Sequence, residues 1–368
     1  MYNIIILIYL TGVAIASLFN KKVKMMWQGE KKAIRTIREK MDPNARYVWF
    51  HAASLGEFEQ GRPIIERFRK ERPEFKILLT FFSPSGYEVR KNYEGADIIC
   101  YLPLDTPHNA RRFLRTIRPE MAFFIKYEFW YNYLHILRHR NIPVYSVSSI
   151  FRPNQIFFRW YGRQYGKVLK CFTRFFVQNE RSRELLAKIG IHDVTVSGDT
   201  RFDRVLSIKE QSKELPIVSA FLNGKKVIRY TDARDTWESA NEAQRDALSK
   251  RLAEADAIII NCFGLLSSIY RYGKVAYVGG GFGVGIHNVL EAAVWGMPVI
   301  FGPNHERFQE AVALIAEGGG FSICDTHDFE IFMRKFSSDP NALAEASRKA
   351  GENVKSQSGA TDAVMRVV

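Results

Sequence analysis

Short β-branched and aromatic runs alternate with amphipathic stretches along this chain, and this alternation most constrains its fold. Segments with helical spacing, such as 57–72 and 106–117, separate the runs. Such a pattern is typical of a parallel sheet covered by helices on both faces. The first set of predicted strands is YVWFHA (47–52), KILLTFF (76–82), DIICYL (97–102), MAFFIK (121–126), PVYSVS (143–148) and RFFVQ (174–178).

A second set of runs follows Val205, so we predict an α/β protein with two sheet-containing domains. A chain of 368 residues is long enough to bury two cores. The predicted domains are 46–205 and 206–340, followed by a polar helix over 341–368. The second set is KKVIRY (225–230), AIIINCF (257–263), KVAYVGG (274–280), MPVIFG (297–302) and FSIC (321–324).

The N-terminal segment predicts a membrane anchor over residues 1–20. Residues 4–19 carry no charge, and Lys21, Lys22 and Lys24 follow directly. The run is long enough to span a bilayer, and its lysines follow it, unlike those of a cleavable signal peptide. The positive-inside rule places residues from Lys21 onward in the cytoplasm and the N-terminus outside. The alternative is a buried helix of a soluble domain.

The net charge of +14, from 53 basic and 39 acidic residues, indicates an anionic partner. Residues 21–45 form a basic segment suited to a membrane surface. The stretch 151–176 has nine aromatic and six basic residues and no acid. It suits a surface that meets lipid and phosphate, or a helix with core aromatics. Nucleic acid could use the same chemistry, but a membrane anchor disfavours it. The four cysteines form no CxxC pair, so neither a zinc ribbon nor a redox dithiol is indicated.

HAASLGEFEQ (51–60) contains the first candidate site. A strand ends near His51, Ser54 is a good helix N-cap, and Glu57 follows three residues later. One interpretation is a capping box, in which Glu57 only accepts a backbone N–H. The other is a general base, because a carboxylate at the carboxyl edge of a parallel sheet faces the usual ligand crevice.

The segment 278–302, VGGGFGVGIHNVLEAAVWGMPVIFG, predicts a phosphate-binding turn. Its glycines follow a strand and precede a helix expected near Asn288. The exposed backbone N–H groups of a glycine-rich turn and of a helix N-terminus can bind a phosphate. The segment matches neither the P-loop motif nor GxGxxG. Asn288 and Glu291 have capping-box spacing, and Glu291 could also hold a ribose hydroxyl. The pattern favours a nucleotide ligand.

Together these motifs resemble the 3-deoxy-D-manno-octulosonic acid (Kdo) transferases of lipopolysaccharide synthesis. The matching parts are the N-terminal anchor, HAASLGEFEQ, IKYEFWYN, VSGDTRFDRV, FGLLSSIYRYGKVAYVGGG and GIHNVLEAAVWGMPVIFGPN. The resemblance implies a GT-B glycosyltransferase with two Rossmann-like domains facing a cleft. It implies transfer of Kdo from CMP-Kdo to a lipid A precursor (lipid IVA), without metal or other cofactor, at the cytoplasmic face of the inner membrane.

The resemblance also assigns residues. Glu57 matches the family's catalytic base, and Glu128 in KYEFW matches a second acidic cleft residue. Ser54, Gly56 and Lys126 fall in the same acceptor motifs. The implied donor-binding residues are Ser197, Gly198, Arg201, Gly280, Gly281, Gly285, Asn288 and Glu291, with Asp199 standing where the family has Asn.

One departure from the family concerns the start of the C-terminal domain. Lys225, Lys226 and Val227 run directly into IRYTDA, where the family first has a strand, a loop, a helix and a second strand. We therefore predict an internal deletion of roughly fifty residues after Val227. Loss of strands from a parallel sheet exposes pairing groups and apolar surface. The alternative functions are an impaired membrane-anchored lipid-binding homologue and another GT-B nucleotide-sugar transferase.

Overall fold

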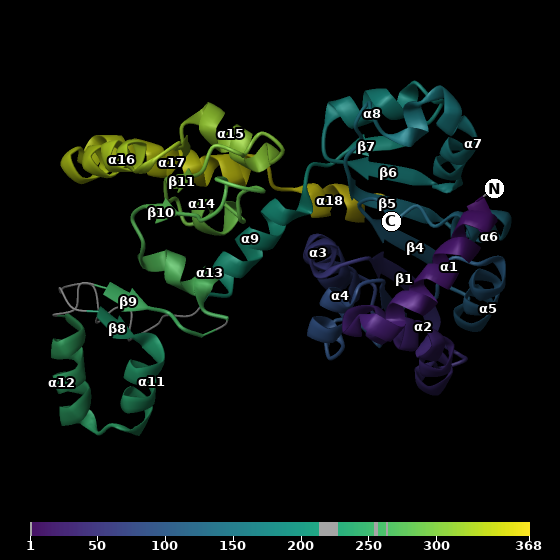
Figure 1. The fold of residues 1–368 in the computed structure, drawn as a ribbon, viewed down its shortest axis with the longest axis horizontal. Helices are drawn as coiled ribbons and strands as arrows, with labels where there is room; N and C mark the ends of the chain where they lie inside the picture. Colours follow the sequence, from purple (N-terminus) through teal and green to yellow (C-terminus); the bar gives the residue numbers. More distant parts are fainter. Residues whose placement is uncertain (1, 213–226, 254–256, 263) are drawn as a thin grey trace. The chain divides into compact units, whose positions relative to one another are not determined.

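The computed structural model describes residues 2–212, 227–253, 257–262 and 264–368. The chain divides into two compact units, each described here by itself (Figure 1). Unit 1 comprises Met1–Arg204 together with Ser358–Val368, and unit 2 comprises Val205–Gln357. The predicted residues Lys225, Lys226 and Phe263 lie outside the described residues.

Unit 1 is built on a seven-stranded sheet of order β3-β2-β1-β4-β5-β6-β7, in which every neighbouring pair is parallel. The chain moves outward from β1 to β3, then returns to the other side of β1 with β4. A topological switch point therefore lies between β1 and β4. In chain order the elements are α1 (Tyr2–Phe19), α2 (Lys21–Lys40), β1 (Arg46–Ala52), α3 (Leu55–Glu71), β2 (Phe75–Phe81), α4 (Pro84–Arg90), β3 (Ile98–Tyr101), α5 (Pro107–Ile117), β4 (Met121–Ile125), α6 (Tyr131–His139), β5 (Val144–Ser149), η1 (Ile156–Phe158), η2 (Trp160–Gly162), α7 (Arg163–Gly166), η3 (Lys167–Cys171), β6 (Arg174–Val177), α8 (Glu180–Ala187), β7 (Val194–Val196), α9 (Thr200–Glu210), which continues into unit 2, and α18 (Ala360–Met365).

Both faces of this sheet are buried, as continuous apolar strands require. Along β1, Trp49 packs with α5 and α6 residues in one core cluster, whereas Val48 and Phe50 pack with α3 residues in another. Helices accordingly cover both faces of the sheet (Figure 1). The six strands predicted for this region are present, and β7 is an additional short strand that the sequence pattern did not reveal.

The aromatic side chains of the stretch 151–176 are mostly buried or half-buried. Phe151, Phe157 and Phe175 are almost fully buried, so the expectation of a lipid-facing surface is wrong for these rings. The physical reason is that these rings pack on one another and on β6, with Phe172 and Phe175 centroids 4.8 Å apart. Trp160 and Tyr161 are the exceptions and remain exposed.

Two helices precede the sheet. Of the described residues, α1 forms the one helix long and apolar enough to cross a membrane. The α2 helix begins at Asn20, whose side chain accepts hydrogen bonds from Lys22 N and Val23 N. One face of α2, including Ile34 and Ile37, is buried against unit 1, whereas its lysines are exposed.

Unit 2 contains two separate parallel sheets in its described part, β8-β9 and β10-β11-β12. The β8-β9 sheet is poorly covered, since Ile259 is 52% exposed. The elements are β8 (Val227–Arg229), α11 (Tyr230–Ser239), α12 (Glu242–Ala253), β9 (Ala257–Ile259), α13 (Leu266–Ile269), η4 (Tyr270–Tyr272), β10 (Ala276–Tyr277), α14 (Leu290–Ala293), β11 (Val299–Phe301), α15 (Gln309–Glu317), β12 (Gly320–Ser322), α16 (Thr326–Ser338) and α17 (Pro340–Ser356).

The C-terminal residues form two helices instead of the one predicted over 341–368. Gly359 has a φ of 105° and separates α17 from α18. The α18 helix belongs to unit 1, where Val364 joins the core beneath α3. Asp203 attaches its first turn, accepting hydrogen bonds from Gly359 N at 2.6 Å and from Thr361 N and Oγ1 at 2.7 Å.

We predict that Asp203→Ala loosens α18, because it leaves two backbone N–H groups without their charged acceptor. The expected cost is about 1–3 kcal/mol. Hydrogen–deuterium exchange of the 358–368 peptide measures it, and exchange should accelerate by roughly tenfold or more. Asp193→Ala, which removes an exposed carboxylate, is the control and should leave this peptide unchanged. Equal exchange in both variants would contradict the attachment.

Candidate active site at the carboxyl edge of the first sheet

The switch point of unit 1 brings together the two carboxylates selected from the sequence. Glu57 follows β1 on the first turn of α3, and Glu128 lies three residues after the end of β4. Since β1 and β4 are neighbouring parallel strands, their carboxyl ends lie at one edge of the sheet. This edge, at a switch point, is where open α/β sheets bind ligands.

The Glu57 side chain takes part in the capping box of α3 by accepting from the N-cap residue Ser54. Its Oε2 accepts hydrogen bonds from Ser54 N at 2.9 Å and from Ser54 Oγ at 3.2 Å. Both bonds use the same oxygen, and within the described structure Oε1 accepts none. The capping and general-base interpretations are therefore compatible, because one oxygen fixes the carboxylate while the other can accept a proton.

Two side chains hold Glu128, the half-buried Trp130 and the buried His51. Trp130 Nε1 donates to its Oε2 at 2.6 Å, and His51 Nε2 lies 3.2 Å from the same oxygen. His51 is fully buried, and its Nδ1 lies 2.9 Å from Thr80 Oγ1.

A chain of hydrogen bonds assigns the His51 tautomer. Trp49 Nε1 donates to Thr80 Oγ1 at 2.8 Å, and His51 Nδ1 lies 2.9 Å from the same hydroxyl. Because an ionised Glu128 carboxylate can only accept, its contact with Nε2 assigns the ring proton to that nitrogen. His51 then carries its own proton on Nε2 and donates it to Glu128. This assignment gives each of these buried groups a partner and fixes the orientation of the carboxylate.

Burial raises the pKa of the Glu57 carboxyl above its ordinary value, and the negative charge of Glu128 raises it further. The hydrogen bond from Ser54 and the positive charge of Lys126 act in the opposite direction. A carboxylate with a raised pKa is a stronger base than an ordinary glutamate. The electrostatics therefore suit Glu57 to remove a proton from a bound hydroxyl.

The backbone around the two carboxylates is strained and open. Lys126 and Ser148, directly after β4 and within the end of β5, have φ values of 63° and 52°. Such left-handed conformations of non-glycine residues gather at functional sites. A Cβ at Gly56 would meet no atom within 4 Å, so open space lies beside Glu57.

The segment 197–201 lies at the carboxyl end of β7 in unit 1. Ser197 N and Gly198 N both hydrogen bond to Val177 O, and Gly198 has a φ of 84°. Asp199 is buried and accepts from Gln60 Nε2 at 3.1 Å and from Arg201 Nη2 at 2.8 Å. The substitution of Asp for Asn is thus compensated locally, because Arg201 neutralises the added charge.

The glycine-rich loop of unit 2 folds back on itself. Gly281 N donates to Gly285 O at 2.7 Å, and Gly280 and Gly281 have φ values of 93° and 87°. A Cβ on Gly281 would come within 2.7 Å of Gly302 Cα, and one on Gly285 within 2.9 Å of the Phe308 ring. These glycines are therefore required by the fold of the loop itself.

The helix after this loop begins later than the sequence predicts. Asn288 Oδ1 accepts from Leu290 N at 3.1 Å, and this local turn delays the helix to Leu290. Asn288 Nδ2 donates to Glu291 Oε1 at 2.9 Å, so the two residues do meet. With four residues, α14 is too short to provide the dipole that the predicted helix would offer.

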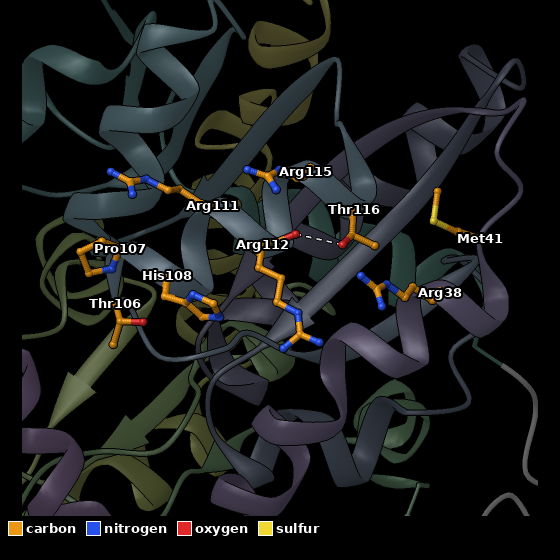
Figure 2. Close-up of a pocket in the computed structure, with 9 residues that line it drawn as sticks. All are labelled: Arg38, Met41, Thr106, Pro107, His108, Arg111, Arg112, Arg115 and Thr116. Atoms are coloured by element: carbon orange, nitrogen blue, oxygen red, sulfur yellow. Dashed lines mark hydrogen bonds between the residues drawn. The ribbon is translucent and has the colours of Figure 1, made fainter.

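A hollow of about 940 Å³ lies along α5 and is lined by none of these residues. It includes Arg112 and Arg115 from α5 and Arg38 from α2 (Figure 2). Its lining has no carboxylate, so it lacks the acidic pair found at the switch point. Across the described ranges, no cluster of three or more His, Cys, Asp or Glu side chains could hold a metal ion.

The sequence selected Glu57 and Glu128 but missed the residues that position them. His51 and Trp130 stand inside the motifs HAASLGEFEQ and KYEFW, where they were not singled out. Thr80 lies in β2, in a run that predicts only a strand, and it reaches the site because β2 is the neighbour of β1. A histidine at the end of a predicted strand was the available signal.

The geometry places the chain among α/β proteins of GT-B-like fold, as solved structures bear out. UDP-GlcNAc 2-epimerase from Neisseria meningitidis matches with a TM-score of 0.58 and 14% identity, covering 87% of this chain and 98% of that one. MurG from Acinetobacter baumannii matches with a TM-score of 0.50 and 14% identity, covering 88% and 99%. At these identities the likeness concerns the fold alone.

Sequence comparisons find similarity to one family. Residues 27–204 match the family model of 3-deoxy-D-manno-octulosonic-acid transferase. The transferase of that name from Aquifex aeolicus is 28% identical over 299 residues, covering 75% of this chain and 82% of the relative. The one from Bordetella pertussis is 25% identical over 361 residues, covering 83% of each. The chain is thus similar to Kdo transferases, through the family model in its N-terminal half and through these relatives over three quarters or more of its length.

We predict that Thr80→Val lowers the free energy of unfolding by about 1–3 kcal/mol, because the buried Trp49 N–H loses its acceptor and His51 Nδ1 loses its donor. Urea unfolding followed by tryptophan fluorescence measures the change. Thr80→Ser keeps the hydroxyl and should cost clearly less. If the two variants unfold alike, the hydroxyl does not support the site.

Proposed function

We propose that this protein is an inverting glycosyltransferase that moves Kdo from CMP-Kdo to a lipid A precursor. The observation that carries the proposal is the pairing of Glu57 and Glu128 at the switch point, within the part of the chain that matches the family. The raised pKa of Glu57 and its unoccupied Oε1 fit the role of a base that acts on a sugar hydroxyl.

The proposed reaction is a single displacement. Glu57 removes the proton of an acceptor hydroxyl, whose oxygen attacks the anomeric carbon of Kdo as the bond to the CMP phosphate breaks. The electron pair of that bond leaves with CMP, and the configuration at the anomeric carbon inverts. Glu128, held by His51 and Trp130, maintains the charge environment of the base. The proposal requires no metal ion.

The donor is proposed to bind unit 2 through the loop of Gly280, Gly281 and Gly285, with Asn288 and Glu291 beside it. Asn288 and Glu291 already form a hydrogen-bonded pair, which suits recognition of ribose hydroxyls. Ser197, Gly198 and Arg201 are proposed as further donor-binding residues. The transfer is proposed to occur at the cytoplasmic face of the inner membrane, where the apolar α1 helix meets a lipid substrate.

We predict that Glu57→Gln lowers the turnover number by about 10²-fold or more, because the amide cannot accept the proton. The assay follows transfer of Kdo from CMP-Kdo, generated in situ, to a lipid A precursor in detergent. Glu66→Gln is the matched control: Glu66 lies on the same helix and pairs with Arg62. Turnover that survives in Glu57→Gln would refute the assigned role.

We predict that Glu128→Gln moves the acid limb of the pH–rate profile to lower pH. The base works only when ionised, so turnover falls as the pH drops through the pKa of Glu57. That pKa is raised partly by the charge of Glu128, and its removal lowers the pKa. An acid limb that stays in place or moves to higher pH would contradict the electrostatic coupling between Glu128 and Glu57. Glu66→Gln again serves as the control.

The second candidate function is an impaired homologue that binds lipid but holds the donor poorly. In a doubly wound sheet of order 3-2-1-4-5-6, the first two strands lie between the third and the fourth. A chain without those two would leave the third strand apart from the fourth, and the described part of unit 2 likewise has β8-β9 apart from β10-β11-β12. The split supports the proposed deletion after Val227.

Titration with CMP separates the two candidates. A ligand bound by the native state alone raises the melting temperature, by an amount equivalent to about 2.7 kcal/mol at one hundred times its dissociation constant. We predict a small or absent shift for this chain and a clear shift after a two-strand segment is restored before Ile228. A full shift in the unaltered chain would mean that donor binding tolerates the deletion.

A further inference from the structure

The apolar surface of α1 is largely uncovered. Ile4, Leu7 and Ile8 in its first half are each at least 60% exposed, and Leu18 near its end is 78% exposed. An apolar surface of this extent marks an interaction site. The contacts of α1 with the rest of unit 1 decide how it can meet a membrane.

The first turn of α1 is fastened to the body of unit 1. Tyr2 Oη donates to Asp105 Oδ2 at 2.7 Å, and Asn132 Nδ2 donates to Asn3 Oδ1 at 2.8 Å. Asp105 is fully buried and also accepts from the backbone N–H groups of Asn132 and Tyr133 at the start of α6. The N-terminal end of α1 therefore hydrogen bonds to the residues that cap α6.

Aromatic and apolar contacts hold α1 along its length. The centroid of the Tyr2 ring lies 4.9 Å from that of the Tyr131 ring and 5.9 Å from that of the Tyr165 ring. Further along, Val13 is buried in a small cluster with Met26 of α2 and Tyr101 of β3. Both halves of α1 thus rest on unit 1.

This arrangement is incompatible with a spanning helix. Eighteen residues rise by about 27 Å, close to the thickness of a bilayer core. If α1 crossed the bilayer, Tyr2 would lie on the side opposite Lys21 and the sheet. Instead, Tyr2 and Asn3 contact the same unit that begins after Lys21.

A second apolar element adjoins α1. Ile156, Trp160 and Tyr161 are 45%, 82% and 63% exposed, although the neighbouring Phe151 and Phe157 are buried. An apolar hollow of about 440 Å³ is shared by Tyr2 and Ile5 of α1 and by Ile156 and Tyr161. The exposed apolar surface is therefore continuous across elements distant in sequence.

The charge next to this surface fits anionic lipid. Lys21, Lys22, Lys24, Lys31 and Lys32 on α2 are exposed, and α2 continues directly from α1. Lysines at the edge of an apolar surface favour anionic headgroups. Exposed Trp and Tyr side chains also favour the interface between headgroups and acyl chains.

We propose that α1 lies in the plane of the membrane and, with Ile156, Trp160 and Tyr161, docks unit 1 on an anionic bilayer surface. This rests on the proposed membrane association but replaces the expected spanning anchor with one whose N-terminus stays on the side of the sheet. This docking also brings the bilayer next to the candidate site. The Tyr2 ring on α1 contacts the Tyr131 ring. The residue before Tyr131 is Trp130, which donates a hydrogen bond to Glu128.

Protease access to the N-terminus tests this arrangement. The full chain carries a cleavable N-terminal tag and a C-terminal tag in inverted inner-membrane vesicles, whose cytoplasmic face is outward. In-plane docking predicts that both tags are cleaved at similar rates. An N-terminal tag that is protected while the C-terminal tag is cleaved would overturn it and leave membrane association standing. Absence of the chain from the vesicle fraction would overturn both.

A flotation assay tests the second element. Trp160→Ser should lower the partition of the full chain into phosphatidylcholine vesicles containing phosphatidylglycerol by about tenfold, which is the scale of one buried apolar side chain. Ile331→Ser, at an exposed apolar residue of α16, is the matched control and should leave the partition unchanged. Equal partition of the two variants would exclude Trp160 from the docking surface.

Discussion

The reversal of strand order between β1 and β4 is the constraint on which the proposed chemistry depends. Two segments that are distant in sequence end side by side because their strands pair in parallel register, with His51 opposite Phe124. Glu57 and Glu128 follow these strands, and burial together with the charge of Glu128 raises the pKa of Glu57. The helices and apolar core on both faces of the sheet keep that register.

The buried polar residues around Glu128 complete this arrangement. The chain from Trp49 through Thr80 and His51 crosses two strands and ends on the carboxylate. Buried groups of this kind must be paired, so each fixes the orientation of the next. Glu57 is fixed differently, by a capping interaction that leaves one oxygen available. Glu128 is thus held rigidly while Glu57 keeps a free oxygen, and the proposed role of Glu57 as a general base requires both.

Strand runs in unit 1 were predictable because a buried parallel strand is apolar throughout, and Glu57 and Glu128 were predictable from the motifs around them. The order in which the strands pair was not predictable from the sequence. The hydrogen bond between Thr80 of β2 and His51 of β1 could therefore not be found. The stretch 151–176 misled because composition cannot tell an aromatic residue that packs inward, such as Phe157, from one that is exposed, such as Trp160. The late start of α14 reflects a side-chain turn at Asn288 that competes with helix.

The most direct test of this account is the pKa of Glu57 itself in the intact protein. Titration of its ¹³C-labelled carboxyl by NMR, assigned by comparison with Glu57→Gln, measures that pKa without any activity assay. The account predicts a value above the ordinary glutamate value of about 4.3. A midpoint at or below that value would show that burial and Glu128 do not prepare Glu57 as a base, and would contradict the account.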